Sequence, residues 1–178
     1  MNDPDFDIIR NVQQGQVNDY EVLVKKYQSP VFNLLYRMLN QQESAEALTQ
    51  EVLVKAYENL GSFNFKSRFF SWIYRIAINT AISYRKKNLR FVTLDSMPQD
   101  VVKPAEEILM AKERSAILQA AINRLKDKYK TVIILRYYEQ LSYHEIAEAL
   151  NIDERKVKSR LFDARQLLRS QLQNNNFF

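Results

Sequence analysis

The chain has 178 residues, a formal net charge of +5 and a pI near 9.3. It is therefore long enough for one ordinary domain or two small ones, and its charge favours an anionic partner. It contains no cysteine and a single histidine, His144, which excludes disulfides, thiolate metal ligands and multi-histidine metal centres. Because its only glycines are Gly15 and Gly61, a glycine-rich phosphate loop cannot form. With no catalytic constellation in the sequence, we predict a protein that is not an enzyme and uses no metal or cofactor.

The ends and apolar runs of the chain give no sign of a leader or a membrane span. The first residues, "MNDPDFD", are acidic and lack the apolar stretch of a signal peptide. The longest aliphatic run, Val132–Leu135, is far shorter than the roughly 20 residues that cross a bilayer as a helix. The absence of cysteine fits a reducing compartment. We predict a cytoplasmic protein without membrane insertion.

Apolar residues recur with the helical period along most of the chain, and glycine and proline are rare, which predicts an all-α fold. Four helices are expected in the first half, at Phe6–Gln14, Tyr20–Leu39, Ser44–Leu60 and Phe69–Asn88. Four more are expected near Ala105–Leu125, Tyr129–Glu139, Tyr143–Leu150 and Glu154–Leu172. The segment between the groups contains Pro98 and Pro104 and has no sustained period, so it is predicted to be a flexible linker. The prediction is two small helical domains, residues 1–90 and 107–178, joined by residues 91–106.

The third predicted helix and the residues just before it are acidic. Between Gln42 and Leu60, Lys55 is the single basic residue among four glutamates, Glu43, Glu46, Glu51 and Glu58. Such a surface beside a positively charged neighbour suits a protein partner better than DNA. A solvated helix face is the alternative.

The next block, Gly61–Val92, combines basic and aromatic residues and contains no acidic residue. Basic charge follows a phosphate backbone, and aromatic faces stack on unpaired bases for about 1–3 kcal/mol each. We predict single-stranded nucleic-acid contact by Phe63, Asn64, Phe65, Lys66, Ser67, Trp72, Arg75, Asn79 and Lys86. The alternative is that the aromatic residues form the core, with Phe69 and Tyr84 as the first candidates.

The stretch "SYHEIAEALNIDERKVKSRLF" has the signature of a helix-turn-helix. Ser142 and Glu145 have the spacing of a capping box, which predicts the start of a short helix. Asn151 can adopt the left-handed conformation that ends a helix, and Asp153 can cap the next one. In that next helix Val157, Leu161, Ala164 and Leu168 form one apolar stripe.

The second helix of this motif is basic outside its apolar stripe. A recognition helix places such residues against phosphates and base edges in the major groove. The predicted duplex-DNA contacts are Arg155, Lys156, Lys158, Ser159, Arg160, Phe162 and Arg165. A helical hairpin with a solvated basic face is the alternative.

Taken together, these blocks resemble a bacterial sigma factor of the extracytoplasmic-function type, the small two-domain kind, from about Asn18 to Leu172. "YRMLNQQESAEALTQEVLVKAYENLGSF" looks like the polymerase-binding part of sigma domain two. "SRFFSWIYRIAINTAISYRKK" looks like the part that melts the promoter and reads its downstream (−10) element. "LSYHEIAEALNIDERKVKSRLFDARQLLR" is similar to the reader of the upstream (−35) element in domain four.

The resemblance implies a transcription initiation factor that joins RNA polymerase core. Ser44–Val52 would dock on the coiled coil of the largest subunit, through Glu46, Leu48, Thr49, Gln50 and Glu51. The loop Ser62–Ser67 would hold a base flipped out of the downstream element, with Arg75 and Asn79 beside it. The linker would pass through the RNA-exit path, and domain four would touch the flap of the second-largest subunit. An anti-sigma factor is a further partner implied by the family.

Two positions depart from the family pattern. The docking helix of the family often reads Asp-Ala-Glu-Asp, whereas this chain has Ser44 and Ala47 at the first and last of these positions. A small Gly-Thr pair often precedes the recognition helix, and here Arg155 and Lys156 take its place. The longer side chains predict a different choice of upstream bases.

Two other classes of protein fit part of the sequence. A helix-turn-helix repressor or activator would bind duplex DNA only, and would not need the acid-free aromatic block. An all-α adaptor would bind proteins, with basic faces that only keep it in solution. Initiation by core polymerase on a promoter library separates the three hypotheses.

Overall fold

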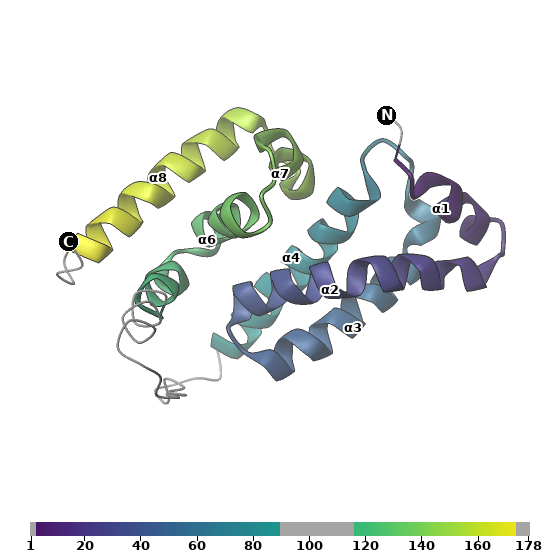
Figure 1. The fold of residues 1–178 in the computed structure, drawn as a ribbon, viewed down its shortest axis with the longest axis horizontal. Helices are drawn as coiled ribbons and strands as arrows, with labels where there is room; N and C mark the ends of the chain where they lie inside the picture. Colours follow the sequence, from purple (N-terminus) through teal and green to yellow (C-terminus); the bar gives the residue numbers. More distant parts are fainter. Residues whose placement is uncertain (1–2, 90–115, 174–178) are drawn as a thin grey trace, which may run out of the picture.

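The computed structural model describes residues 3–89 and 116–173, and every regular element in these two ranges is helical (Figure 1). The predicted all-α fold with two helical domains is confirmed. The predicted linker, residues 91–106, and the first part of the predicted helix Ala105–Leu125 lie outside the described residues. No helix in the described part is long and apolar enough to cross a membrane.

The N-terminal domain is a bundle of four α-helices with two short 3₁₀ turns. Its elements are α1 (Phe6–Gln13), η1 (Val17–Asp19), α2 (Tyr20–Leu39), α3 (Gln42–Glu58), η2 (Leu60–Ser62) and α4 (Phe69–Leu89). The core side of α2 is formed by Leu23, Tyr27, Val31, Leu34, Leu35 and Met38, spaced three or four residues apart. Asn40 ends α2 in the left-handed conformation, with φ 56°. α2 and α3 pack against α4, whose Phe69, Ile73 and Ala77 are buried, and α1 packs against α2.

The C-terminal domain contains a helix at residues 116–124, α6 (Asp127–Ile133), α7 (Tyr143–Leu150) and α8 (Glu154–Gln173). The predicted helix Tyr129–Glu139 is present but begins at Asp127, and its last turn, η3 (Ile134–Tyr138), is π-helical. The wider turn is visible in the hydrogen bond from the Glu139 N–H to the Ile134 carbonyl. Val157, Leu161 and Ala164 of α8 are buried as predicted, and Leu168 is half-buried.

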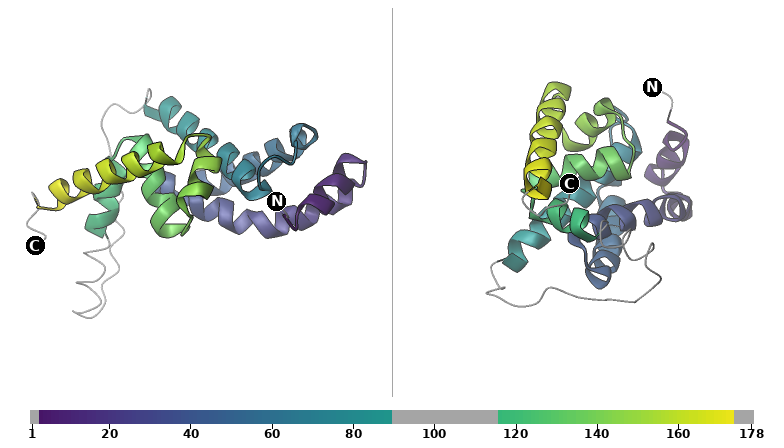
Figure 2. Two further views of the ribbon diagram at one scale, coloured as in Figure 1. Left: turned by 90° about the horizontal axis from the view of Figure 1, so that it is seen from above. Right: turned by 60° about the vertical axis from the view of Figure 1, so that its left-hand side comes forward.

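The two domains lie against each other. α7 runs along α4, and η3 contacts α2. The views in Figures 1 and 2 agree that most of α8 lies on the side of the C-terminal domain that faces away from α4. The first helix of the helix-turn-helix therefore faces the N-terminal domain, and the second faces outward.

Candidate nucleic-acid and protein interfaces

The turn between α7 and α8 has the geometry that its sequence predicts. The hydroxyl of Ser142 accepts the N–H of Glu145 at 3.2 Å, and the Glu145 carboxylate accepts the N–H of Ser142 at 2.9 Å. The pKa of Glu145 is lowered mainly because its charged form accepts that backbone N–H. Asn151 ends α7 with φ 52°, and Asp153 accepts the N–H of Arg155 at 2.6 Å. Local hydrogen bonds thus fix the angle between the two helices.

Helix α8 presents a continuous outward face. Arg155, Lys158, Ser159, Phe162 and Arg165 are exposed and share one side of the helix by the 3.6-residue period. The exposed Gln166 lies on the same side. It was not predicted as a DNA contact, because its side chain is uncharged and the prediction relied on basic residues.

Two of the predicted duplex contacts lie beside this face rather than on it. Lys156 is exposed but rotated away from Arg155 by one residue step, about 100°. Arg160 is half-buried and lines a cleft of about 530 Å³ toward α4. The two long side chains are therefore placed to contact a flanking backbone or the other domain.

The predicted single-strand loop, residues 62–67, is built on an aromatic cluster. Phe63 is 4% exposed, with its ring centroid 5.8 Å from that of Phe69 and 5.6 Å from that of Trp72. Stacking of Phe63 on a base is therefore corrected: this ring is core, because a buried aromatic ring stabilises the fold through its large apolar area. Phe65 and Trp72 are half-buried and therefore remain partly accessible.

The polar part of the loop is exposed and internally ordered. Asn64 and Lys66 are exposed and Ser67 is half-buried, and the Asn64 side-chain oxygen accepts the N–H of Lys66 at 3.2 Å. Phe65, between them, has φ 62°, a conformation that costs energy for a residue with a Cβ. The Gln13 amide of α1 donates to the carbonyls of Leu60 and Phe63 at 2.9 and 3.2 Å. The loop is thus held in a fixed shape by a hydrogen bond within it and by the Gln13 amide of α1.

The N-terminal segment contributes residues that the sequence did not reveal. One carboxylate oxygen of Asp3 accepts the N–H of Phe69, the first residue of α4, at 2.8 Å, and the other accepts the N–H of Asp5 at 3.1 Å. Asp5 in turn accepts from Lys26 at 2.6 Å and from the Tyr27 hydroxyl at 2.5 Å. Burial, together with the Asp5 charge, raises the pKa of Tyr27. Asp3 therefore caps α4 directly after the loop.

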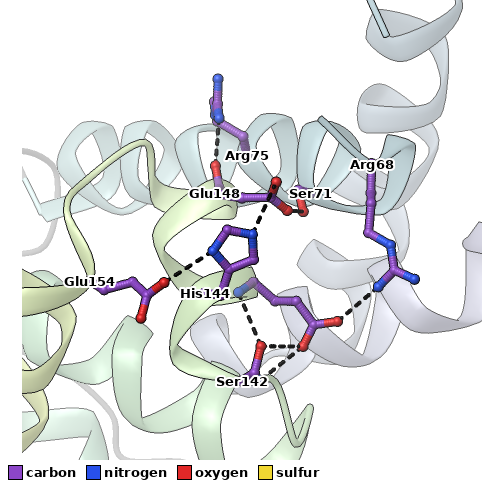
Figure 3. A network of polar contacts seen from close by, with 8 residues as sticks. Arg68, Ser71, Arg75, Ser142, His144, Glu148 and Glu154 are labelled. Atoms are coloured by element: carbon purple, nitrogen blue, oxygen red, sulfur yellow. Dashed lines mark hydrogen bonds and ion pairs between the residues drawn. The ribbon is translucent and has the colours of Figure 1, made fainter. Parts of the chain in front are cut away.

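On α4 the predicted polar stripe borders the C-terminal domain. Arg75 is half-buried, whereas Asn79 and Lys86 are exposed. All three line the cleft that Arg160 also lines. Arg75 is not free, because its guanidinium donates to the carbonyl of Glu148 in α7 at 2.5 Å (Figure 3).

The predicted polymerase-binding residues divide between the surface and the core of α3. Glu46, Gln50 and Glu51 are exposed. Leu48 and Thr49 are each 7% exposed, and the Thr49 hydroxyl donates to the Ala45 carbonyl at 2.6 Å. Assigning these two as contacts is corrected, because the helical period that exposes Gln50 turns them toward the core.

An apolar patch adjoins the acidic side of α3. Val54 is 55% exposed and Tyr57 is 40% exposed. They line a groove of about 540 Å³ with Val17, Tyr20 and Val24. The signal for this patch was available in the sequence as apolar residues outside the buried period. Exposed apolar patches of this kind mark protein contacts.

A second apolar groove lies on the C-terminal domain. It has a volume of about 500 Å³ and is lined by Leu118, Ile122, Ile133, Tyr137, Leu168 and Leu172. Arg165 and Arg169 lie at its border. An apolar groove with basic residues beside it can accept an amphipathic helix with acidic flanks.

Comparisons with known proteins find relatives of both helical domains. Residues 23–91 match the family model Sigma-70 region 2, and residues 115–168 match Sigma-70, region 4. The chain is 35% identical to the ECF RNA polymerase sigma factor SigW of Bacillus subtilis, an alignment that covers 93% of this chain and 95% of SigW. It is 34% identical to the ECF RNA polymerase sigma-E factor of Haemophilus influenzae, over 93% of this chain and 94% of that protein.

Two solved structures share the fold. CnrH in complex with the cytosolic domain of CnrY superimposes with a TM-score of 0.70 at 18% identity, covering 94% of this chain and 96% of CnrH. The sigma factor RpoE of Bartonella quintana, in complex with the anti-sigma factor NepR, gives a TM-score of 0.67 at 22% identity, covering 87% and 97%.

Proposed function

The chain belongs to the extracytoplasmic-function sigma factors, which bind RNA polymerase and direct it to specific promoters, and from that premise we propose how its two domains divide promoter recognition. The N-terminal domain captures the melted downstream element, and the C-terminal domain reads the upstream element as duplex. The observation that carries this proposal is the outward basic face of α8 on a fully capped helix-turn-helix. The polymerase, and not this factor, catalyses RNA synthesis. The factor acts with the polymerase in the cytoplasm.

In the C-terminal domain, Arg155, Lys158, Ser159, Phe162 and Arg165 enter the major groove. Arg155 is close to the start of α8, where a recognition helix meets base edges. Lys156 and Arg160 contact the flanking phosphates. Phe162 is 58% exposed, and its ring packs on a thymine methyl group, as apolar side chains do in the major groove.

In the N-terminal domain, Asn64, Lys66 and Ser67 present polar edges to a flipped base, while Phe65 and Trp72 contribute partly accessible rings. Arg75, Asn79 and Lys86 continue the strand's path along α4. Unstacking a base costs a few kcal/mol per step, so a loop that is already ordered offsets more of that cost than one ordered on binding.

Polymerase docks on α3 through Glu46, Gln50 and Glu51 together with the neighbouring Val54 and Tyr57. Exposed carboxylates steer association with a basic coiled coil, and the apolar pair supplies the desolvated centre. The groove around Ile122 and Tyr137 takes the flap of the second-largest subunit. An anti-sigma factor, a class of partner that is bound to RpoE in the Bartonella quintana complex, competes for these surfaces.

The decisive experiment combines purified core polymerase and this chain on a random promoter library, with specific initiation as the readout. Selective transcripts with an upstream and a downstream consensus are the expected result. Binding to duplex DNA without polymerase-dependent initiation would favour the helix-turn-helix regulator instead. Absence of both would favour the protein-binding adaptor.

Reversing Glu46 and Glu51 to lysine tests the docking surface. Core association should be lost while the chain stays folded, because exposed charges contribute little to stability. The matched control is Asp7→Lys on α1, a carboxylate that is 90% exposed. Unchanged co-elution of the double variant with core would contradict docking through α3.

Replacing Asn64 and Asn79 with alanine tests base capture. Open-complex formation should slow, and closed-complex binding through the C-terminal domain should persist. A template already unpaired across the downstream element should rescue initiation. Promoter opening is measured by the permanganate reactivity of unpaired thymines. Opening at the parental rate would refute the role of the loop.

A further inference from the structure

The single-strand loop, residues 62–67, makes few backbone hydrogen bonds of its own. The N–H of Phe63 donates to the carbonyl of Leu60 at 3.0 Å, and in the described part of the chain the next backbone N–H bonded to a backbone carbonyl is that of Trp72. Between them, the N–H of Lys66 donates to the side chain of Asn64. The shape of the loop therefore depends on side chains that contact it from other elements.

Gln13, the last residue of α1, holds the start of the loop. Its side-chain amide donates to the carbonyl of Leu60 at 2.9 Å and to that of Phe63 at 3.2 Å, and the two N–H groups of one amide suffice for both. The Phe63 carbonyl lies in the same planar peptide unit as the N–H of Asn64. The Gln13 amide thus fixes the direction in which Asn64 leaves the turn η2.

The middle of the loop is held by two other residues of α1. Phe65 has φ 62°, a conformation that costs energy and persists only where the surroundings fix it. The Phe6 and Phe65 rings meet edge to face with their centroids 5.2 Å apart, and the Arg10 guanidinium lies 5.2 Å from the centre of the Phe65 ring. Phe6, Arg10 and Gln13 are four and three residues apart, so they share one side of α1.

The residues before α1 hold the end of the loop. Asp3 accepts the N–H of Phe69 at 2.8 Å, where the loop passes into α4. Asp5 accepts from Lys26 of α2 at 2.6 Å, which ties this segment to the rest of the domain. The start, the middle and the end of the loop are therefore each held by a side chain from residues 3–13.

We propose that Gln13 is a positioning residue for recognition of the downstream element, because its amide holds the loop in the shape that distinguishes the preferred base from the other three. The inference rests on the role proposed above for the loop. The effect of Gln13 passes through the backbone of Leu60 and Phe63 to Asn64. Groups that read a ligand must be held within about 0.5 Å of their productive positions, and a loop with several shapes would satisfy several bases equally well.

A purely structural role for Gln13 predicts a different result. If Gln13 only stabilised the domain, its loss would reduce the folded fraction and weaken the binding of every strand by the same factor. If Gln13 positions Asn64, its loss weakens binding of the preferred base most, because stacking and charge serve every base alike. The ratio of the affinities for the preferred base and for the other bases is therefore the decisive quantity.

The test uses holoenzyme reconstituted from core polymerase and the full chain. Fluorescein-labelled single strands of the downstream element selected from the promoter library carry each of the four bases at the position where the parent discriminates most. Gln13→Met keeps the length of the side chain but removes its N–H donors, and should lower the affinity ratio about fivefold, which corresponds to one neutral hydrogen bond. The matched control, Gln14→Met at the next, exposed residue, should keep the parental ratio.

A second variant restores the donors. Gln13→Lys carries N–H groups on a flexible stem, and its positive charge strengthens the binding of all strands alike. Because a uniform change cancels in the affinity ratio, this variant should recover most of the selectivity that Gln13→Met loses.

Trp72 reports on the loop in the absence of DNA. It is the only tryptophan in the chain, and its ring centroid lies 5.6 Å from that of Phe63. Acrylamide should quench its fluorescence more strongly in Gln13→Met than in the parent or in Gln14→Met.

Two results would overturn the proposal: an affinity ratio of Gln13→Met equal to that of the parent, or a ratio of Gln13→Lys as low as that of Gln13→Met. Failure of the proposed function gives a different pattern. In that case the parental holoenzyme binds all four bases equally at every position, and base selectivity through Gln13 is refuted with it, whereas the quenching of Trp72 still shows whether Gln13 holds the loop.

Discussion

Replacing Asp3 with alanine is expected to destabilise the N-terminal domain and loosen the single-strand loop, although residue 3 lies before the first helix. The Asp3 side chain is the acceptor for the N–H of Phe69 at the start of α4 and for the N–H of Asp5. Asp3 is 7% exposed and Phe69 is fully buried. Water therefore cannot replace the lost acceptor without a rearrangement of the aromatic cluster.

The size of the effect follows from these contacts. Loss of an N-cap costs about 1 kcal/mol, and a buried donor left without a partner costs about 1–3 kcal/mol. These figures describe overlapping parts of one loss, so we expect a decrease of about 2 kcal/mol in the free energy of unfolding. For a domain of this size that is a fall of about 10 °C in Tm. Asp3→Asn retains one acceptor oxygen and should lose about half as much.

Trp72 makes the measurement specific. It is the only tryptophan in the chain, and its ring centroid lies 5.5 Å from that of Phe69, so its fluorescence reports on the affected cluster during thermal unfolding. The control is Asp7→Ala, whose carboxylate is 90% exposed and pairs only at the surface with Arg10. The control should stay within about 0.5 kcal/mol of the parent. If Asp3→Ala and the control have the same Tm, then capping of α4 by the Asp3 side chain does not stabilise the domain.

Three further predictions concern the C-terminal domain. Burial, with the nearby Arg85 charge, lowers the pKa of Lys130 from 10.5 to about 8, against the effect of Asp127. The unfolded chain therefore binds more protons between these values, and stability should rise with pH in that window, by up to about 3 kcal/mol. The variant Lys130→Met should lack this rise, so the difference in unfolding free energy between parent and variant should change with pH across the window. Parallel pH profiles of the two proteins would contradict the prediction. Asn151→Gly should be nearly neutral and Asn151→Val should cost about 1–2 kcal/mol in chemical denaturation, because φ is 52° there. Ser142→Ala should cost about 1 kcal/mol and weaken upstream duplex binding, and an unchanged denaturation midpoint would show that the capping box is dispensable.

The sequence by itself determined the helices and the helix-turn-helix, because these depend on contacts between near neighbours. Ser142 and Glu145 are three residues apart, and the caps at Asn151 and Asp153 act within their own turns. The 3.6-residue period likewise predicted the buried stripe of α8. The predicted bounds Tyr20–Leu39 and Tyr143–Leu150 agree with the structure for the same reason.

Only the tertiary structure decided which residues of each block face solvent and which elements support them. Phe63 has the composition of a stacking residue, but its ring is in the core because four other aromatic rings pack around it. The cap of α4 comes from Asp3, 66 residues away, and Arg75 binds a carbonyl 73 residues away. A carboxylate or a guanidinium can form hydrogen bonds with many different groups. Its partner is decided only when whole helices pack and bring one such group within hydrogen-bonding distance.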